Sequence, residues 1–305
     1  MSQRKKISKT LYWIFTFRIN VFFLALLSCL LLTQLTPYIS ECYGFETDKS
    51  FINKEDNWYK LQASYELGFL DILSHKIQFG SNGSVFDYVK EGGQEVLFPF
   101  SRITAEINMS KRHNLIFLIQ PFDIRTKALL ERDIVVNGIA FKKNTPIDLR
   151  YGFTYYRLSY LYDFWKADDR ELGIGLSFQL RNATIDFASS DGTTLSSNRN
   201  VGPVPIFKFR FRYPFSNGLW IGGEMDGFYA SGKYITGSSN DFEGAILDAS
   251  LRTGFELTDY LDGFLNVRYI GGGAKGTEKN PSGPGDGFTD NWLKTMEISV
   301  GFYLR

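Results

Sequence analysis

The 305-residue sequence has few of the residues on which many functional sites depend. It contains two cysteines, two histidines and four methionines, and both cysteines, Cys29 and Cys42, lie within the first 44 residues. The chain beyond residue 44 has no thiol, and therefore cannot form a disulfide or bind a metal through a thiolate. We expect neither a metal nor a cofactor.

Long apolar runs and an excess of positive charge are also missing beyond the N-terminal region. No stretch of 18 apolar residues occurs after residue 57, so no membrane-spanning helix is expected there. The formal net charge of +1 divides into +4 for residues 1–44, which hold five bases and one acid, and −3 for the rest. This balance excludes the strongly basic surface that nucleic-acid binding needs, and no nucleic-acid partner is expected.

The N-terminal region has the organisation of a secretory signal peptide. A basic segment precedes a twelve-residue apolar stretch, VFFLALLSCLLL (21–32), which is shorter than the roughly 20 residues of a membrane-spanning helix. The small residues around Cys42-Tyr43-Gly44 predict cleavage after Gly44. The predicted parts are a signal peptide (1–44), a periplasmic N-terminal segment (45–57) and a membrane domain (58–305). An uncleaved anchor helix and a lipoprotein cleaved before Cys29 are the alternatives.

The membrane domain alternates apolar and polar residues, a period of two that is typical of strands with two different faces. Its abundant Phe, Tyr and Gly suit strands and tight turns. Ten segments show the pattern, the third, fourth and seventh less regularly: 61–70, 101–109, 114–122, 147–163, 172–181, 207–212, 219–230, 245–256, 265–269 and 296–304. We predict ten strands, with twelve as the alternative. A slip of phase between Arg150 and Arg157 predicts a bulge near Gly152.

The connections between these segments alternate strictly between long and short. The short ones fall near residues 110–113, 166–170, 216–218 and 258–260. Outer-membrane barrels have short periplasmic turns and longer external loops, so the pattern predicts an all-β, transmembrane, antiparallel up-and-down β-barrel in the outer membrane of a Gram-negative bacterium. Its expected partners are outer-membrane lipid and lipopolysaccharide. Aromatic residues predicted at the periplasmic interface are Trp58, Tyr59, Phe164, Trp165, Phe215, Trp220 and Tyr260.

Five stretches resemble a family of bacterial outer-membrane β-barrel proteins that has no assigned activity. They are TPIDLRYGFTYYRLSYLYDFW (145–165), ELGIGLSFQLRNATIDFAS (171–189), NVGPVPIFKFRFRYPF (200–215), EGAILDASLRTGF (243–255) and DGFLNVRYIGGGA (262–274). The resemblance covers roughly residues 60–305 and implies a single-chain barrel, without assigning any site residue. The last strand also resembles the signal that the barrel-assembly machinery recognises, although it ends in Leu304-Arg305 and not in an aromatic residue.

The face predicted to point inward is rich in charge of both signs. Its bases are Arg102, Arg157, Arg181, Lys208, Arg210, Arg212, Arg252 and Arg268, and its acids are Glu66, Glu106, Glu224, Asp226, Asp248, Glu256 and Glu297. Buried charges must be paired, and a ten-stranded barrel has a narrow interior, so we expect an ion-pair network that closes the lumen. The leading interpretation is a non-enzymatic barrel that is structural or interacts at the cell surface. A porin-like channel for small solutes is the alternative, biased toward anions by Lys208, Arg210 and Arg212.

His75 is the candidate for a catalytic site. It follows Ser74 and lies near Asp71, at the predicted external mouth of the barrel. A His with an acidic or hydroxyl partner can act as a general base, so a surface hydrolase is a less favoured hypothesis. Residues 271–276 match G-x-G-x-x-G, but the Pro- and Gly-rich segment that follows is no helix, so we interpret them as part of an external loop.

Overall fold

The computed structural model describes residues 58–165, 167, 169–231, 242–278 and 285–305. The predicted signal peptide, its cleavage site and the segment 45–57 lie outside the described residues. The described part of the chain contains no helix that is long and apolar enough to cross a membrane.

The structure is a closed antiparallel barrel, which confirms the predicted fold class. Its strands are β1 (Tyr59–Phe79), β2 (Phe86–Asp87), β3 (Phe98–Met109), β4 (His113–Gln120), β5 (Asp123–Leu129), β6 (Ile134–Val136), β7 (Ile139–Phe141), β8 (Pro146–Asp163), β9 (Glu171–Ser189), β10 (Leu195–Pro214), β11 (Leu219–Ser231), β12 (Glu243–Thr258), β13 (Leu261–Thr277) and β14 (Phe288–Leu304). The main sheet has twelve strands; β6 and β7 pair only with each other. Because β2 is a short addition to β1, and β4 and β5 share one position beside β8, ten positions surround the barrel, as predicted.

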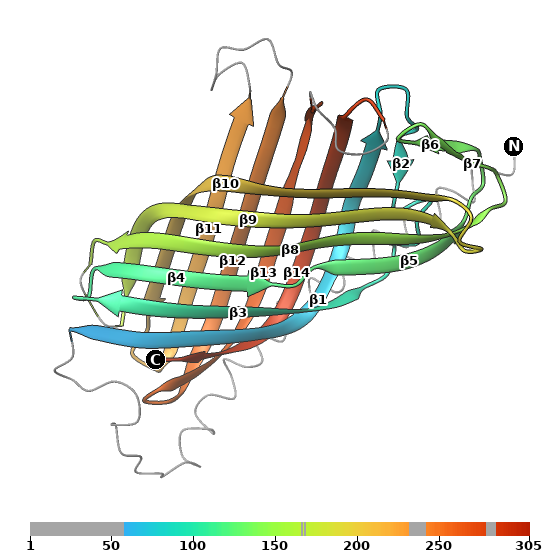
Figure 1. Ribbon diagram of the computed structural model, residues 1–305. Helices are drawn as coiled ribbons and strands as arrows, with labels where there is room; N and C mark the ends of the chain where they lie inside the picture. Colours follow the sequence, from blue (N-terminus) through green and yellow to red (C-terminus); the bar gives the residue numbers. More distant parts are fainter. Residues whose placement is uncertain (1–57, 166, 168, 232–241, 279–284) are drawn as a thin grey trace, which may run out of the picture. The chain divides into compact units, whose positions relative to one another are not determined.

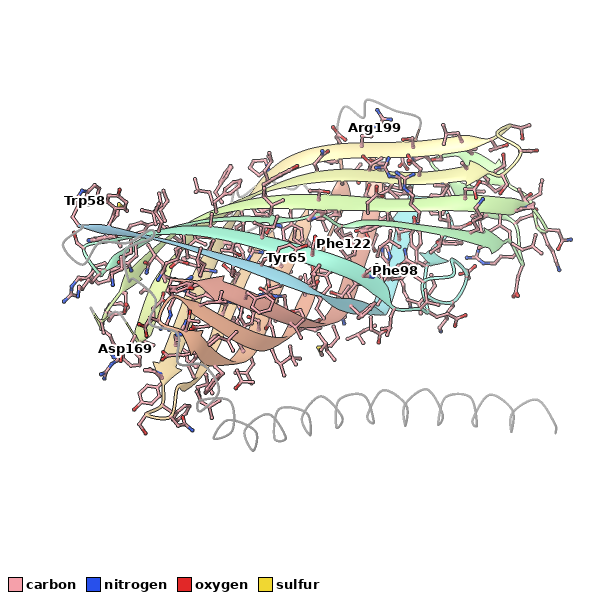
Figure 2. All side chains as sticks on the ribbon, turned by 90° about the horizontal axis from the view of Figure 1, so that it is seen from below. Trp58, Tyr65, Phe98, Phe122, Asp169 and Arg199 are labelled. Carbon is pink, nitrogen blue, oxygen red and sulfur yellow. The ribbon has the colours of Figure 1, made fainter. Side chains whose placement is uncertain are left out.

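Pairing between the first and last strands closes the ring. β14 runs antiparallel to β1 from Ala63↔Leu304 to Phe79↔Thr289, with one shift of register between Ile72 and Ser74. Closure leaves no sheet edge within the ring, so every strand has a partner on both sides where the ring is complete. Trp58 and Asp169 lie at the end of the barrel with the short turns, and Arg199 lies on the opposite half of β10 (Figure 2).

Several strands are much longer than a membrane requires. β1 has 21 residues and β10 has 20, against about 9–11 for a transmembrane β-strand. Beyond the complete ring the wall divides: β5, β8, β9 and β10 run to the right in Figure 1, while β11 to β14 rise toward the top. The two groups part where β10 and β11 stop pairing at Phe207↔Gly227, and where β1 and β3 stop at Leu70↔Phe98.

Along β8 the polar and apolar faces change sides. In the ring the inner face is polar and the outer face apolar, and in the part of the strand beyond the ring, here called the extension, the inner face is apolar and the outer face polar. In the ring Arg157 points inward and is buried, while Leu158 points outward and is exposed. In the extension Leu149 and Tyr151 are buried on the inner side, and Arg150 lies outside. The strand keeps one register with β9 throughout, so the predicted bulge at Gly152 is wrong. What looked like a slip of phase is a change of surroundings, from lipid outside and polar groups inside to water outside and a dry core inside.

That dry core, here called the external core, fills the space between the extended strands and the connections beyond them. It contains residues from β1 to β3, from β5 to β9 and from their connections: Leu70, Ile72, Ile77, Phe79, Phe86, Tyr88, Phe100, Phe122, Ile124, Leu130, Ile134, Val136, Phe141, Ile147, Leu149, Tyr151, Ile185 and Phe187. The external part of the chain is therefore a packed structure.

Residues 271–276 lie within β13. All six pair with β14, and Gly271 to Lys275 also pair with β12. The prediction that they form a loop is wrong. A side chain at Gly273 would place its Cβ 2.1 Å from the backbone oxygen of Asn291. Glycine is needed here because the neighbouring strand approaches closely.

Candidate functional site: the lumen and its external vestibule

The middle of the lumen is filled by charged side chains, which we call the central network. Its members come from eight of the barrel strands, and each side chain is at most 15 % exposed. The bases are Arg102, Arg157, Lys208, Arg252 and Arg268, and the acids are Glu66, Glu224, Asp226, Asp248 and Glu297. All ten belong to the set predicted to point inward, and the numbers of bases and acids are equal.

Asp248 is one centre of this network. Its carboxylate lies 2.5 Å from Arg268 Nη1, 2.9 Å from Arg157 Nη1 and 3.7 Å from Arg102 Nη1. Glu66 faces Arg252 at 3.3 Å and also lies 3.9 Å from both Arg102 and Arg268. The two carboxylates therefore share a cluster of guanidinium groups.

Lys208 extends the network around the lumen. Its Nζ donates to Glu224 Oε2 (2.8 Å) and to Asp226 Oδ2 (3.0 Å). Arg157 Nη1 reaches Asp226 at 2.9 Å, and Arg252 Nη2 reaches Glu224 at 2.5 Å. The ion pairs thus form a continuous circuit in which each carboxylate meets at least one base.

Neutral side chains satisfy much of the remaining hydrogen-bonding capacity of the network. Gln120 accepts from Arg102 (2.9 Å) and donates to Glu297 (2.8 Å), and Gln179 accepts from Arg157 at 2.9 and 2.7 Å. Asn266 donates to Glu66 at 2.7 Å. None of these amides was predicted as a site residue, although Gln179 and Asn266 lie on faces whose alternation predicted inward positions.

A second group of ion pairs closes the periplasmic end. Arg210 forms a bidentate pair with Glu106, at 2.7 Å for both bonds, and its Nε donates to Glu171 at 2.8 Å. Arg212 reaches Asp262 at 2.5 Å, and Arg305 reaches the same carboxylate at 3.0 Å. Glu171, Asp262 and Arg305 were not predicted.

One predicted member of the inward set lies at the rim, and the side chain of another is not described. Glu256 is 40 % exposed and pairs with Arg305 at 3.1 Å, so it lies at the rim. The side chain of Arg181 lies outside what the structure describes.

Trp220 also differs from its prediction. It points into the lumen and is buried, with the Arg212 guanidinium 4.1 Å from its ring centroid. A Cβ at Gly254 would lie 2.2 Å from this ring, so glycine makes room for it. The prediction of Trp220 at the lipid interface is wrong, whereas Trp58, Phe164, Trp165, Phe215 and Tyr260 are exposed at that end.

The outward face of the ring is apolar and exposed on every side. Residues that are at least half exposed include Leu67, Phe69, Ile174, Leu176, Phe178, Phe207, Met225, Leu251, Val300 and Phe302. A belt of this extent is not stable in water, and a closed ring satisfies the backbone hydrogen bonds that lipid cannot. The chain is an outer-membrane β-barrel.

No protein-family model matches this barrel, and no curated protein is similar to it in sequence. Solved structures of other outer-membrane barrels resemble it in fold, among them the following three. The outer-membrane protease OmpT from Escherichia coli has a TM-score of 0.44 and 11% identity, over 84% of this chain and 99% of that one. Ail, the attachment invasion locus protein of Yersinia pestis, has a TM-score of 0.32 and 9% identity, over 80% of this chain and 98% of that one. The Pseudomonas putida toluene transporter TodX has a TM-score of 0.32 and 8% identity, over 80% of this chain and 90% of that one. At these scores the similarities carry no argument about function.

On the external side of the central network the barrel contains a cavity of about 550 Å³, which we call the vestibule. Its lining includes Tyr155, Arg157 and Gln179 next to the network. The walls are mixed. Their apolar side chains include Phe153, Ile185, Phe228, Ile246, Ile270 and Leu293, and their polar ones include Asn198, Arg199, Asn200, Lys275 and Asn291. The volume lies within the range of about 300–1,000 Å³ that small-molecule sites occupy.

The structure does not bring His75, Ser74 and Asp71 together. The His75 ring is fully buried in the external core, 4.3 Å from the Tyr88 ring centroid, and its Nδ1 lies 2.7 Å from Gln94 Oε1. The strand register turns Ser74 and Asp71 to the opposite, outward face of β1. The described residues also contain no group of three or more His, Cys, Asp or Glu arranged to hold a metal.

Burial lowers the pKa of His75 to about 4, below the ordinary value of 6.5, because the dry surroundings disfavour the imidazolium. His75 lies beyond the lipid-facing part of β1, whose outward face there carries Asp71, Lys76 and Gln78. The ring is therefore neutral at pH 7, and packs against Tyr88 as an aromatic side chain.

We expect acid to loosen the segment around Tyr88 and Gln94. When the segment is open, His75 takes up a proton below pH 6.5, and when it is closed, only below about pH 4. The stability of the closed segment is therefore lost as the pH falls from 6.5 to about 4, and it changes no further below that. At pH 5 the opening equilibrium should be about 20-fold larger than at pH 7, or about 2 kcal/mol. Hydrogen exchange of the Tyr88 and Gln94 amides measures it. His75→Phe keeps an aromatic ring and should remove the excess pH dependence; an equal dependence in both proteins would contradict the prediction.

Proposed function

We propose that the protein is a non-conducting outer-membrane barrel, structural or surface-interacting, whose lumen is closed by the central network. The observation that carries the proposal is the continuous circuit of buried ion pairs. Its members come from strands on different sides of the ring, as when Arg157 on β8 meets Asp248 on β12 at 2.9 Å. A solute that passed through would have to separate these groups and leave charges buried without partners, which is costly.

The three bases on β10 do not favour an anion channel. Lys208 pairs with two acids, Arg210 with Glu106 and Glu171, and Arg212 with Asp262. Paired bases offer a passing anion little net attraction. A hydrolase that uses His75 has no support either, because the ring is buried and turned away from Ser74 and Asp71. Outer-membrane lipid and lipopolysaccharide stay the proposed partners of the outer surface, and the barrel-assembly machinery the proposed partner during insertion.

Conductance in planar bilayers tests the proposal. Wild-type protein should show no stable channels. Arg157→Ala combined with Asp226→Ala removes a pair that is 2.9 Å apart without leaving a lone charge. It should open a water-filled path and give discrete conductance steps.

Leu158→Ala combined with Met225→Ala is the matched control. These residues lie on the same two strands and face lipid. This variant should stay silent. Large, stable channels in the wild-type protein would contradict the proposal and favour the small-solute channel.

A further inference from the structure

A groove of about 630 Å³ crosses the outer surface of β11 to β14 near their external ends. It begins where β10 leaves β11, after their last pair, Phe207↔Gly227. Beyond this pair, Phe228 to Ser231 of β11 pair with β12, and β10 runs away from β11 (Figure 1). The wall therefore has a corner at this point, and we call the hollow on its lipid-facing side the outer groove.

Aromatic side chains form the two sides of the outer groove. The outward-facing residues of its lining include Phe207 and Tyr229 on one side, which are 64 % and 56 % exposed, and Tyr269 and Trp292 on the other. The strand register places Ala245 directly beside Tyr229 and two strands from Trp292, so a small side chain lies between the aromatic ones. Aromatic residues favour the level of the lipid head groups. The outer groove is thus an apolar depression at the outer interface of the membrane.

Two lysines beside the outer groove carry positive charge that the protein does not offset. Lys294 belongs to the lining, and Lys76 lies on the neighbouring strand β1, opposite Trp292. Both side chains are exposed on the outer face, and neither forms an ion pair with any other described residue. Lys275 differs from them, because it pairs with Asp290 at 3.1 Å. Lys76 and Lys294 are therefore available to an anion from outside the chain.

These two lysines are close enough to share one anion. Lys76 is opposite Trp292 and Lys294 is opposite Ser74, which makes the lysines diagonal neighbours on paired strands. Diagonal neighbours are about 7–8 Å apart, within reach of long side chains. Two like charges at this distance repel each other, and an anion between them relieves the repulsion. Lysine side chains also extend along apolar surface and keep the ammonium group in water, so both can reach the lipid head groups.

We propose that the outer groove binds one molecule of lipopolysaccharide, with an acyl chain between the aromatic side chains and a phosphate group between Lys76 and Lys294. The position near the external ends of the strands places the outer groove in the outer leaflet, where lipopolysaccharide is the anionic lipid. Phosphate forms strong, charge-assisted hydrogen bonds with ammonium groups. The site rests on the proposed function in one respect, the assignment of lipopolysaccharide as a partner of the outer surface.

The phosphate anchor is tested with lipid A and with the same lipid A after removal of its phosphates. Native mass spectrometry of the purified full chain in detergent measures the affinity for each. Wild-type protein should bind the phosphorylated form about 30-fold more tightly, which corresponds to about 2 kcal/mol from two lysines. Lys76→Gln combined with Lys294→Gln should abolish this preference. Equal binding of the two forms by the wild type, or a preference that persists in the double variant, would overturn the anchor.

Lys127→Gln combined with Lys142→Gln is the matched control for charge. The side chains of these lysines are 83 % and 77 % exposed, and both lie in the external part of the chain, away from the outer groove. The variant loses the same charge and should keep the preference of the wild type. Loss of the preference in this variant would show that lipid A responds to net charge alone, and would also overturn the site.

Ala245→Phe tests the apolar part of the site. The added ring fills the space between Tyr229 and Trp292 and should abolish the binding of both forms of lipid A. Ala63→Phe makes the same change at the periplasmic end of the lipid-facing surface, on β1, and should bind as the wild type does. Wild-type binding by Ala245→Phe would overturn the outer groove as the site. Phosphatidylglycerol that binds the wild type as tightly as lipid A would overturn the assignment to lipopolysaccharide.

Conductance of the same preparations separates a failure of this site from a failure of the proposed function. A wild-type protein that conducts contradicts the closed lumen, whatever lipid it binds. A silent protein that does not prefer phosphorylated lipid A contradicts only the site in the outer groove.

Discussion

Asp248→Ala should lower the free energy of unfolding by about 3–5 kcal/mol, the usual cost of removing one partner from a buried ion pair. Asp248 is fully buried and lies within 2.5 to 3.7 Å of Arg268, Arg157 and Arg102. Without the Asp248 carboxylate, less negative charge offsets the mutual repulsion of the three guanidinium groups. Urea unfolding of the protein in lipid vesicles measures the change.

Ser250→Ala is the control for this variant. Ser250 is the next inward residue on β12, and its buried Oγ has no hydrogen-bond partner within the described residues. Removing that hydroxyl should change stability by less than about 0.5 kcal/mol. An Asp248→Ala protein as stable as Ser250→Ala would show that the central network contributes nothing to folding.

Leu251→Arg should cost about 2–4 kcal/mol, because it places a cation in the middle of the bilayer. Leu251 lies beside Asp248 and Ser250 on the same strand, faces outward and is 62 % exposed to what we identify as lipid. Tyr229→Arg, at the outer interface, should cost only about 0–1 kcal/mol by the same unfolding measurement. Equal costs at the two positions would mean that this face does not contact lipid.

The ring of ten strands could be predicted because its two faces meet opposite surroundings. In β9, residues such as Phe178 and Gln179 alternate regularly across the membrane, and each short turn marks a change of direction. Alternation therefore also predicts which charges point inward. It does not predict their partners, because Arg210 on β10 and Glu106 on β3 meet only through the curvature of the closed ring.

The parts of the site that were missed lie at the ends of strands or beyond the membrane. Glu171 and Asp262 precede the regular part of their strands, and only the positions of the turns bring them into the lumen. His75 follows a shift of register between Ile72 and Ser74, so counting from Leu67 gives it the wrong face. The extensions were missed for a different reason: their inner face is apolar, the reverse of the pattern in the ring.

That reversal also determines how deep the barrel sits in the membrane. Thr154 and Asn182 are strand neighbours on the outer side of β8 and β9, directly above the exposed apolar pair Tyr156 and Leu180. A downward shift by two residues, roughly 7 Å along a strand, would draw this pair toward hydrocarbon. An equal upward shift would expose Tyr156 and Leu180 to water. Both displacements are unfavourable, so the wall keeps one vertical position and holds the external core clear of the lipid.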